Sequence, residues 1–297
     1  MDNIVDNSTT SLPNLYIMML CFAVLSFFVT ISLLLIVGLA RVETSYIFIL
    51  VTNIIIANLI HIFSYIFNWV LDNGDLLTGE GMCQVQAIFM IWSSMSQELW
   101  ISVFVCVVYL MLSKGIILEK KKLFHFVIYY LLCVLLPLII SLVFYFCGIL
   151  GKNSHYCWVE INKGIAPQII IYGMRYINFI FNVVFTIFIL KYLCSLGSSP
   201  ILLEKGRQFI SYPIIQILGM ILPSLNRFQP LVEAIGDVLT IPALISVGLQ
   251  GVLFPICFGW YSNAYYLMKT CCNKEKAKKP ADAPLTDESL VDDVSSI

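Results

Sequence analysis

Long apolar segments separated by short polar ones dominate the sequence. Seven runs are bounded by charged or turn-forming residues, and they span residues 15–40, 46–71, 84–112, 123–150, 167–193, 208–225 and 236–260. A bilayer core about 30 Å thick requires roughly twenty apolar residues of helix, and each run has about this length or more. The pattern predicts an all-α membrane protein built as a seven-transmembrane helix bundle.

Composition agrees with this pattern. Of the 297 residues, 60% are hydrophobic and only 12% are charged, which lies outside the range of soluble domains. The first run is too long for a cleaved signal peptide and is followed by no clear small-residue cleavage site, so we expect it to remain as a helix. The predicted organisation is a short N-terminal segment at 1–14, a transmembrane domain at 15–272 that ends in a short juxtamembrane helix, and a disordered polar tail at 273–297.

The distribution of Lys and Arg predicts the orientation of the bundle. With the N-terminus outside, thirteen basic residues fall on the cytoplasmic side and three on the outer side. Cytoplasmic segments carry the excess of positive charge in membrane proteins, so the C-terminus is expected inside. The inner basic residues are explained by topology alone, or they form a face that meets a cytoplasmic partner. The candidates for such a face are Lys114, Lys120, Lys121, Lys122, Lys205 and Arg207.

Several residues are candidates for covalent modification. Asn7 begins an Asn-Ser-Thr glycosylation sequon on the predicted outer side. Cys271 and Cys272 follow the last run on the inner side, where juxtamembrane cysteines can be palmitoylated. Cys83 opens the third run and Cys157 lies in the second outer loop, so both face the oxidising side, and we predict a disulfide between them.

The third run carries an acidic residue near its centre, within SSMSQELW. Glu98 lies fifteen residues beyond Cys83, about 22 Å along a helix. A carboxylate at that depth costs at least about 2.5 kcal/mol in contact with lipid, so it is expected to face the bundle interior. Helical spacing places Ser94 on the same stripe as Glu98, and Gln86 and Gln97 on the adjacent stripe.

Arg175 is the one Arg within an apolar run, and it is the obvious counter-charge for Glu98. It lies only about 10 Å into the fifth run, about 10 Å shallower than Glu98, which argues against a direct pair. In one interpretation Arg175 binds an anionic or polar ligand group while Glu98, neutral or partly so, belongs to a deeper activation network. In the other, both residues only join helices by hydrogen bonds, with Asn178 among the neighbours. Trp158 beside Cys157 either covers the ligand or belongs to an interfacial aromatic belt.

Rival functional classes differ in the residues that they need. A retinal protein needs a lysine in the seventh helix, and residues 236–260 contain none. The three histidines, His61, His125 and His155, lie at different depths, so no metal site is expected. A transporter built from repeats should show two similar halves, and none is seen beyond shared hydrophobicity. Transport of a small polar or anionic solute nevertheless remains the alternative to a receptor.

Four segments resemble one receptor family. CQVQAIFM (83–90), LWISVFVCVVYLM (99–111), YCWV (156–159) and LQGVLFPICFG (249–259) are similar to the third helix, the second outer loop and the seventh helix of the cyclic-AMP-receptor-like G-protein-coupled receptors of slime moulds and other protists. The family's marker positions correspond here to Cys83, Gln86, Trp100, Cys157 and Trp158.

The chain departs from that family in the seventh helix. Phe254 stands three residues after Gly251, where the family usually has Asn. The resemblance implies a plasma-membrane receptor, not an enzyme, which binds an extracellular small-molecule ligand and activates a heterotrimeric G protein on the cytoplasmic side. It also implies that membrane lipid surrounds the protein. No cofactor and no nucleic-acid partner are expected.

Overall fold

The computed structural model describes residues 12–39, 46–72, 80–114, 122–153, 156–159, 165–195, 200–225 and 240–261. Their elements in chain order are α1 (Leu12–Leu39), α2 (Tyr46–Asp72), α3 (Glu80–Lys114), α4 (Lys122–Tyr130), the π-helical turn η2 (Leu131–Leu135), α5 (Leu136–Phe146), β1 (Leu150–Asn153), β2 (Tyr156–Val159), α6 (Ile165–Ser195), α7 (Pro200–Leu225) and α9 (Thr240–Tyr261). Because α4, η2 and α5 follow one another without a break, the described residues form seven long helical segments, and each overlaps one predicted run.

The largest disagreement at a helix start concerns α7. The apolar run begins at residue 208, whereas α7 begins at Pro200 and includes Glu204, Lys205 and Arg207. Glu, Lys and Arg are good helix formers, so they interrupt hydrophobicity without interrupting the helix. Proline at a first helical position is also favourable, because its missing N–H has no partner there in any case.

The predicted fourth helix, residues 123–150, ends too late. The helix stops at Phe146, and Gly148 takes a positive φ of 64°. Its N–H donates to Tyr145 O at 2.9 Å, and Ile149 N–H donates to Phe144 O at 3.1 Å, the two bonds of a Schellman motif. Glycine adopts this left-handed conformation without steric cost, and the chain leaves the helix for β1.

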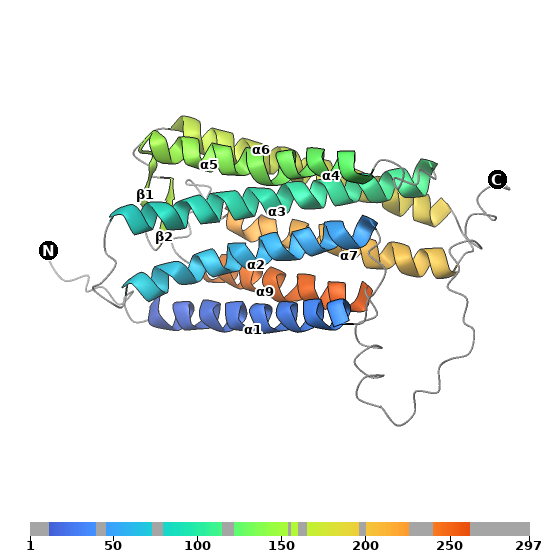
Figure 1. Cartoon of the computed structure of the whole chain (residues 1–297), viewed down its shortest axis with the longest axis horizontal. Coiled ribbons are helices and arrows are strands. Elements are labelled where there is room, and N and C mark those ends of the chain that lie inside the picture. The colour runs from blue at the N-terminus through green and yellow to red at the C-terminus, as the bar shows by residue number, and fades with distance from the viewer. Residues whose placement is uncertain are drawn as a thin grey trace, which may run out of the picture.

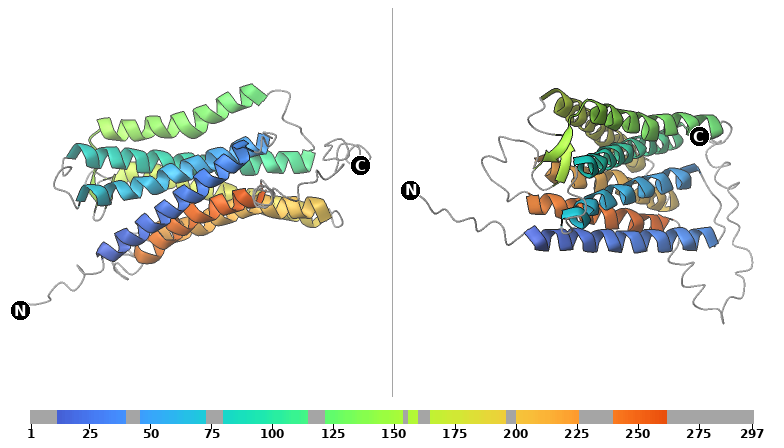
Figure 2. Two further views of the ribbon diagram at one scale, coloured as in Figure 1. Left: turned by 60° about the horizontal axis from the view of Figure 1, so that its bottom comes forward. Right: turned by 60° about the vertical axis from the view of Figure 1, so that its left-hand side comes forward.

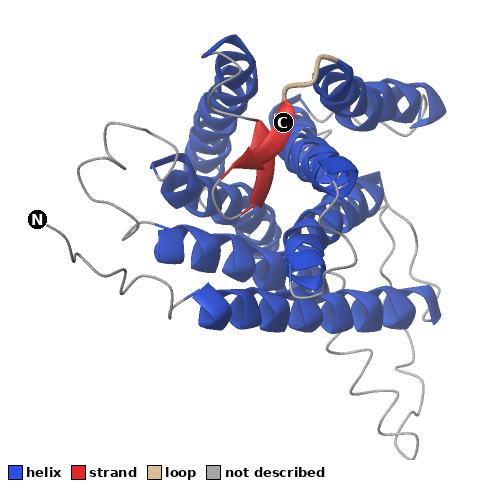
Figure 3. Cartoon of the chain, turned by 90° about the vertical axis from the view of Figure 1, so that its left-hand side faces the viewer, coloured by secondary structure: helices blue, strands red, loops and turns tan. Residues whose placement is uncertain are grey.

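β1 and β2 form an antiparallel hairpin at one end of the bundle. Leu150 pairs with Val159, and Lys152 pairs with Cys157. The hairpin contacts α3, and it lies at the same end as the start of α1 (Figure 1). Viewed from that end, the strands lie among the ends of the helices (Figure 3). They form the only sheet among the residues that the structure describes.

Helix α3 lies at the centre of the bundle. It contacts α2, η2, α5, α6, α7 and both strands (Figure 1). Trp92 on α3 donates a hydrogen bond from Nε1 to Val134 O at 3.1 Å, which joins α3 to the π-helical turn. The continuous α4–α5 segment lies at the edge, beside α3 (Figure 2). Helix α9 lies between α1 and α7, both of which it contacts.

Two apolar clusters fill the interior. The larger one surrounds Trp100, Phe104, Tyr212 and Phe254, where the ring of Phe104 meets Tyr212 edge-on and Tyr212 stacks on Phe254. The smaller cluster joins the first half of α3 to the hairpin, and Trp158 belongs to it. The polar side chains described below lie on the same helices as these clusters.

The outer surface of the bundle is apolar as well. Phe28 on α1, Phe146 on α5 and Ile177 on α6 are 62%, 79% and 69% exposed, respectively. Within the described ranges, four helical stretches are long and apolar enough to cross a membrane: Tyr46–Ser64, Gly81–Ser113, Phe124–Phe146 and Ile169–Cys194. Shorter apolar helical stretches lie at Leu20–Leu35, Ile210–Pro223 and Ile245–Cys257. An apolar exterior on apolar helices of this length is that of an all-α multi-pass membrane protein.

Candidate functional site

Glu98 and Arg175 form a direct ion pair between α3 and α6. Arg175 Nε donates to Glu98 Oε1 at 2.7 Å. The Glu98 side chain is 1% exposed and that of Arg175 is 19% exposed. A carboxylate withdrawn this far from water is stabilised by the adjacent guanidinium, and removal of the guanidinium would leave an uncompensated buried charge.

The expectation that these residues lie at different depths is wrong. Glu98 is about 27 Å from the start of α3 at Glu80, and Arg175 is about 15 Å from the start of α6 at Ile165. The two side chains still meet, so the two helix starts do not lie at the same level. Counting residues along each helix ignored this stagger and the length of the Arg side chain.

The ion pair forms one wall of a small polar cavity. The cavity has a volume of about 30 Å³, enough for about two water molecules. Ser94 and Gln97, both predicted site residues, line it beside Glu98 and Arg175. Trp158 of the hairpin also lines the cavity and is 3% exposed, so its side chain is buried within the bundle. Further lining residues are His61, Gln216, Gly219, Met220, Pro223, Val247 and Gln250.

The second carboxylate oxygen of Glu98 has a different environment from the first. Glu98 Oε2 is buried and has no hydrogen-bond partner among the described residues. A buried carboxylate oxygen favours a hydrogen-bond donor, from protein, water or ligand. The Ser94 hydroxyl, in the same lining, already donates to Ile91 O at 3.2 Å.

Four amide side chains, Asn58, Gln97, Gln216 and Gln250, form what we call the amide network. Gln97 Nε2 donates to Asn58 Oδ1 at 3.3 Å and to Gln216 Oε1 at 3.4 Å. Gln250 Nε2 donates to the same Gln216 oxygen. All four side chains are buried. The amide network therefore joins α2, α3, α7 and α9 directly beside the Glu98–Arg175 pair.

The network continues to α1 through the backbone of α9. Gly251 O accepts hydrogen bonds from Ser26 Oγ at 2.8 Å and from Asn58 Nδ2 at 3.4 Å. A Cβ at Gly251 would lie 1.7 Å from Ile62 Cδ1. A side chain at this position would have to displace the end of Ile62, so glycine allows the close packing of α9 against α2.

His61 contacts α3 beside the cavity. Its Nδ1 lies 3.3 Å from Ser93 Oγ. Asn58 and His61 of α2 thus both form hydrogen-bonding contacts with neighbouring helices, and His61 lines the cavity as well.

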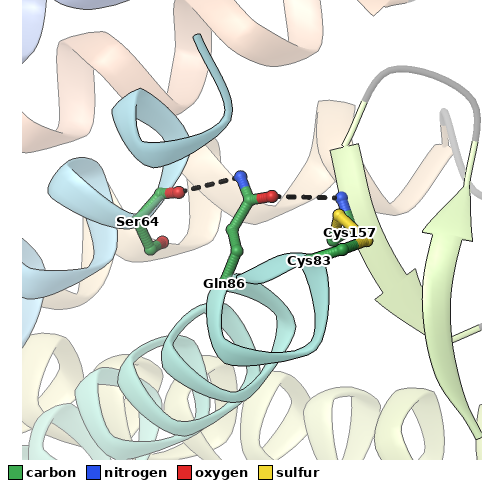
Figure 4. Close-up of a disulfide and its surroundings, with 4 residues drawn as sticks. All are labelled: Ser64, Cys83, Gln86 and Cys157. Atoms are coloured by element: carbon green, nitrogen blue, oxygen red, sulfur yellow. Dashed lines mark hydrogen bonds between the residues drawn. A yellow bond between two sulfur atoms is a disulfide. The ribbon is translucent and has the colours of Figure 1, made fainter. Parts of the chain in front are cut away.

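The predicted disulfide is present, and Gln86 reinforces it (Figure 4). Cys83 and Cys157 are bonded with their Cα atoms 5.2 Å apart. Gln86 Nε2 donates to Ser64 O at 3.0 Å, and its Oε1 accepts from Cys157 N at 3.4 Å. Gln86 thus connects α2, α3 and the hairpin. Gln86 does not line the cavity, and its two hydrogen bonds position the hairpin.

Asn178 also lies outside the cavity lining. Ser102 Oγ donates to Asn178 Oδ1 at 3.5 Å and to Glu98 O at 3.0 Å, one helical turn beyond the ion pair. Asn178 therefore strengthens the contact between α3 and α6, as the structural interpretation of the sequence expects.

Gln216 and Gly219 are site residues that the sequence analysis missed. Gln216 is the one amide residue in the apolar stretch Ile210–Pro223, and a strongly polar residue in an apolar run is the signal that drew attention to Glu98. Gly219 carries no such signal. A Cβ there would lie 2.5 Å from Gln250 Oε1, so this glycine makes room for the Gln250 side chain.

The predicted basic face is only partly described. Lys114 ends α3, Lys122 begins α4, and Lys205 and Arg207 lie in the first part of α7, all at the end of the bundle opposite the hairpin (Figure 1). Lys120, Lys121, Asn7, Cys271 and Cys272 lie outside the described residues, as do the juxtamembrane helix and the tail.

Comparison with known proteins adds no relative. No protein-family model matches the sequence, and a search of curated proteins finds no match. Function is therefore inferred from the geometry of the cavity and from its position in the bundle.

Proposed function

We propose that this protein is a G-protein-coupled receptor whose ligand binds at the Glu98–Arg175 cavity. The observation that carries the proposal is the position of the ion pair. It lies beside a buried cavity, under Trp158 of the disulfide-linked hairpin, and next to an amide network that reaches four helices. A group that binds there contacts several helices at once.

The mechanism is a population shift without chemistry on the ligand. A ligand that prefers one arrangement of the helices shifts the equilibrium by its differential affinity for that arrangement. Contacts with Gln97, Gln216 and Gln250 couple the cavity to α3, α7 and α9. Helices α7 and α9 contain Pro213, Pro223 and Pro255, and proline weakens a helix locally, so these helices are suited to bend. The G protein then binds at the end opposite the hairpin.

We include in the proposal a seven-span topology with the N-terminus outside, in the plasma membrane. Supporting observations are the seven helical segments, the hairpin at one end and the positions of Lys114, Lys122, Lys205 and Arg207 at the other (Figure 1). Under this topology Asn7 is glycosylated, and Cys271 and Cys272 are palmitoylated. A mobility shift on glycosidase treatment that is lost in Asn7→Gln would test the orientation. A fully expressed protein without that shift contradicts the outer placement of Asn7.

The proposal includes membership of the cyclic-AMP-receptor-like family. The Cys83–Cys157 bridge, the contact of Gln86 with Cys157 and the buried positions of Trp100 and Trp158 support it. Phe254, which replaces the family's usual Asn, stacks on Tyr212 with ring centroids 5.9 Å apart. The amide network beside Gly251 takes the place of a polar switch built on that Asn.

The deciding experiment measures nucleotide exchange on heterotrimeric G proteins by the purified protein in lipid nanodiscs. Basal exchange and exchange during a ligand screen are compared in wild type, Arg175→Ala and Tyr176→Ala. Tyr176 is the neighbouring residue on α6, is 45% exposed and lies outside the cavity lining, so it serves as the matched control. We expect exchange in wild type and Tyr176→Ala and a several-fold change in Arg175→Ala. No exchange under any condition, together with solute uptake into sealed vesicles, would contradict the receptor and support the transporter.

A further inference from the structure

The charge balance of the cavity restricts the chemistry of what binds in it. Arg175 is the one cationic side chain in the cavity lining, apart from the titratable His61, and Glu98 is the one anionic side chain there. Their contact at 2.7 Å makes the pair neutral as a unit. The described lining therefore carries no net positive charge to attract an anion.

An anionic ligand group would place a second negative charge beside a single guanidinium. Arg175 would then be shared between that group and the Glu98 carboxylate, which is 1% exposed and would lose part of the charge that compensates its burial. A cationic group would face the opposite problem, because Arg175 already lies against the same carboxylate and repels a second positive charge.

Glu98 presents an unsatisfied hydrogen-bond acceptor to the cavity. Glu98 Oε2 is buried without a partner among the described residues, while Oε1 accepts from Arg175. Gln97, Gln216 and Gln250 are already bonded to one another. The volume of about 30 Å³ admits one small polar group rather than a whole ligand.

From these observations we infer that the cavity recognises an uncharged hydroxyl or amide group, which donates a hydrogen bond to Glu98 Oε2 and leaves the Glu98–Arg175 pair intact. The inference rests on the proposed function, in that it takes this cavity as the ligand site. It excludes compounds that reach the cavity with a phosphate, carboxylate or ammonium group. The remainder of such a ligand lies outside the cavity.

Three probes of nearly equal shape test the inference: acetate, acetamide and acetamidinium, which carry one negative charge, no charge and one positive charge. Each is titrated against the purified protein in nanodiscs at matched ionic strength, and the midpoint of thermal unfolding is recorded. Ligands that bind only the folded state raise this midpoint. We expect acetamide to raise it in wild type and the two ions to have little effect.

Glu98→Gln provides a second, opposite prediction. The substitution removes one negative charge, so the cavity becomes more positive by one unit whatever else Arg175 contacts. We expect acetate to stabilise this variant with an apparent Kd at least about tenfold below its value for wild type. Tyr176→Ala, whose side chain lies outside the cavity lining, should respond as wild type does.

The wild-type titration decides the question even if Glu98→Gln fails to fold. Stabilisation of wild type by acetate or acetamidinium equal to or above that by acetamide overturns the inference, and so does the absence of any effect of acetamide. Because the titration uses no G protein, its failure is distinct from failure of the receptor. Selective stabilisation by acetamide without nucleotide exchange would leave the ligand class standing and remove the receptor.

Discussion

Helix α3 is less apolar than the α4–α5 segment, yet it lies deeper in the bundle. Over Gly81–Ser113 the mean hydropathy is 1.7, and over Phe124–Phe146 it is 2.7, yet the first stretch is the more deeply buried of the two. Glu98, Gln86 and Gln97 on α3 are all buried, whereas Leu135 and Phe146 at the bundle's edge are exposed. In a soluble protein the more apolar helix would be inside.

The difference follows from the solvent. Lipid chains are as apolar as leucine, so an apolar side chain gains little by leaving them, whereas a polar side chain must find partners inside the bundle. Helix α3 collects the polar groups because it contacts neighbours on all sides. The segment from α4 to α5 is joined to α3 by the hydrogen bond from Trp92 Nε1 to Val134 O, and to α2 by the one from Tyr130 Oη to Asn53 Oδ1.

The strongest test of this comparison removes Arg175 of α6, which provides the positive charge beside Glu98 of α3. Arg175→Ala leaves the buried Glu98 carboxyl group without its counter-charge, which should cost about 3–5 kcal/mol of folding free energy. Thermal unfolding in nanodiscs measures the effect. The double variant Arg175→Leu with Glu98→Leu should be more stable than Arg175→Ala, because it removes both charges. Equal stability of Arg175→Ala and wild type would show that the pair contributes nothing.

The next largest effect is expected on the edge segment. Leu135→Lys places a charge on a 43% exposed position near the middle of Phe124–Phe146, which should cost about 2.5–3.5 kcal/mol of membrane insertion. The fraction of correctly inserted protein in expressing cells measures this cost. Leu135→Ala is the control and should insert nearly as wild type does. Normal insertion of the lysine variant would mean that this face does not meet lipid.

A smaller effect is expected where α9 approaches α2. Gly251→Ala forces a Cβ against Ile62, and overpacking of this kind costs about 1–3 kcal/mol. Ile62→Ala in the same chain should recover part of the loss. Gly173→Ala on α6 is the control: a Cβ there has nothing within 4 Å, and alanine favours a helix. The midpoints of thermal unfolding are measured for wild type, Gly251→Ala, the double variant and Gly173→Ala. A Gly251→Ala variant as stable as wild type would contradict the close approach of α9 to α2.

The smallest effect is expected in the amide network. Gln216→Leu removes the oxygen that accepts from both Gln97 and Gln250. Interhelical hydrogen bonds in membranes contribute about 0.6 kcal/mol each on average, so a loss of about 1 kcal/mol is expected. Leu218→Ala on the exposed side of α7 should have no such effect on the unfolding midpoint. If both variants unfold alike, the bonds to Gln216 add no stability of their own.

The sequence by itself determined which segments form helices, and it predicted the burial of Glu98 and the pairing of Cys83 with Cys157. Hydropathy is a local property, and a helix in lipid satisfies its own backbone, so each apolar run predicted a helix whatever its neighbours were. The burial of Glu98 followed from the cost of a charge in lipid, and the Cys83–Cys157 bridge followed from the prediction that both cysteines lie on the same side of the membrane. The early stop of α5 could be anticipated only in part, because Gly148 signals a turn without giving its type.

Only the tertiary structure decided which side chains meet. The Glu98–Arg175 pair depends on the stagger of α3 against α6, and the shared role of Gln216 depends on the packing of α7 beside α9. Both arise from the fit of side chains between helices, which is set by residues distant in sequence. The free oxygen of Glu98, on which the ligand chemistry rests, exists only in that packed arrangement.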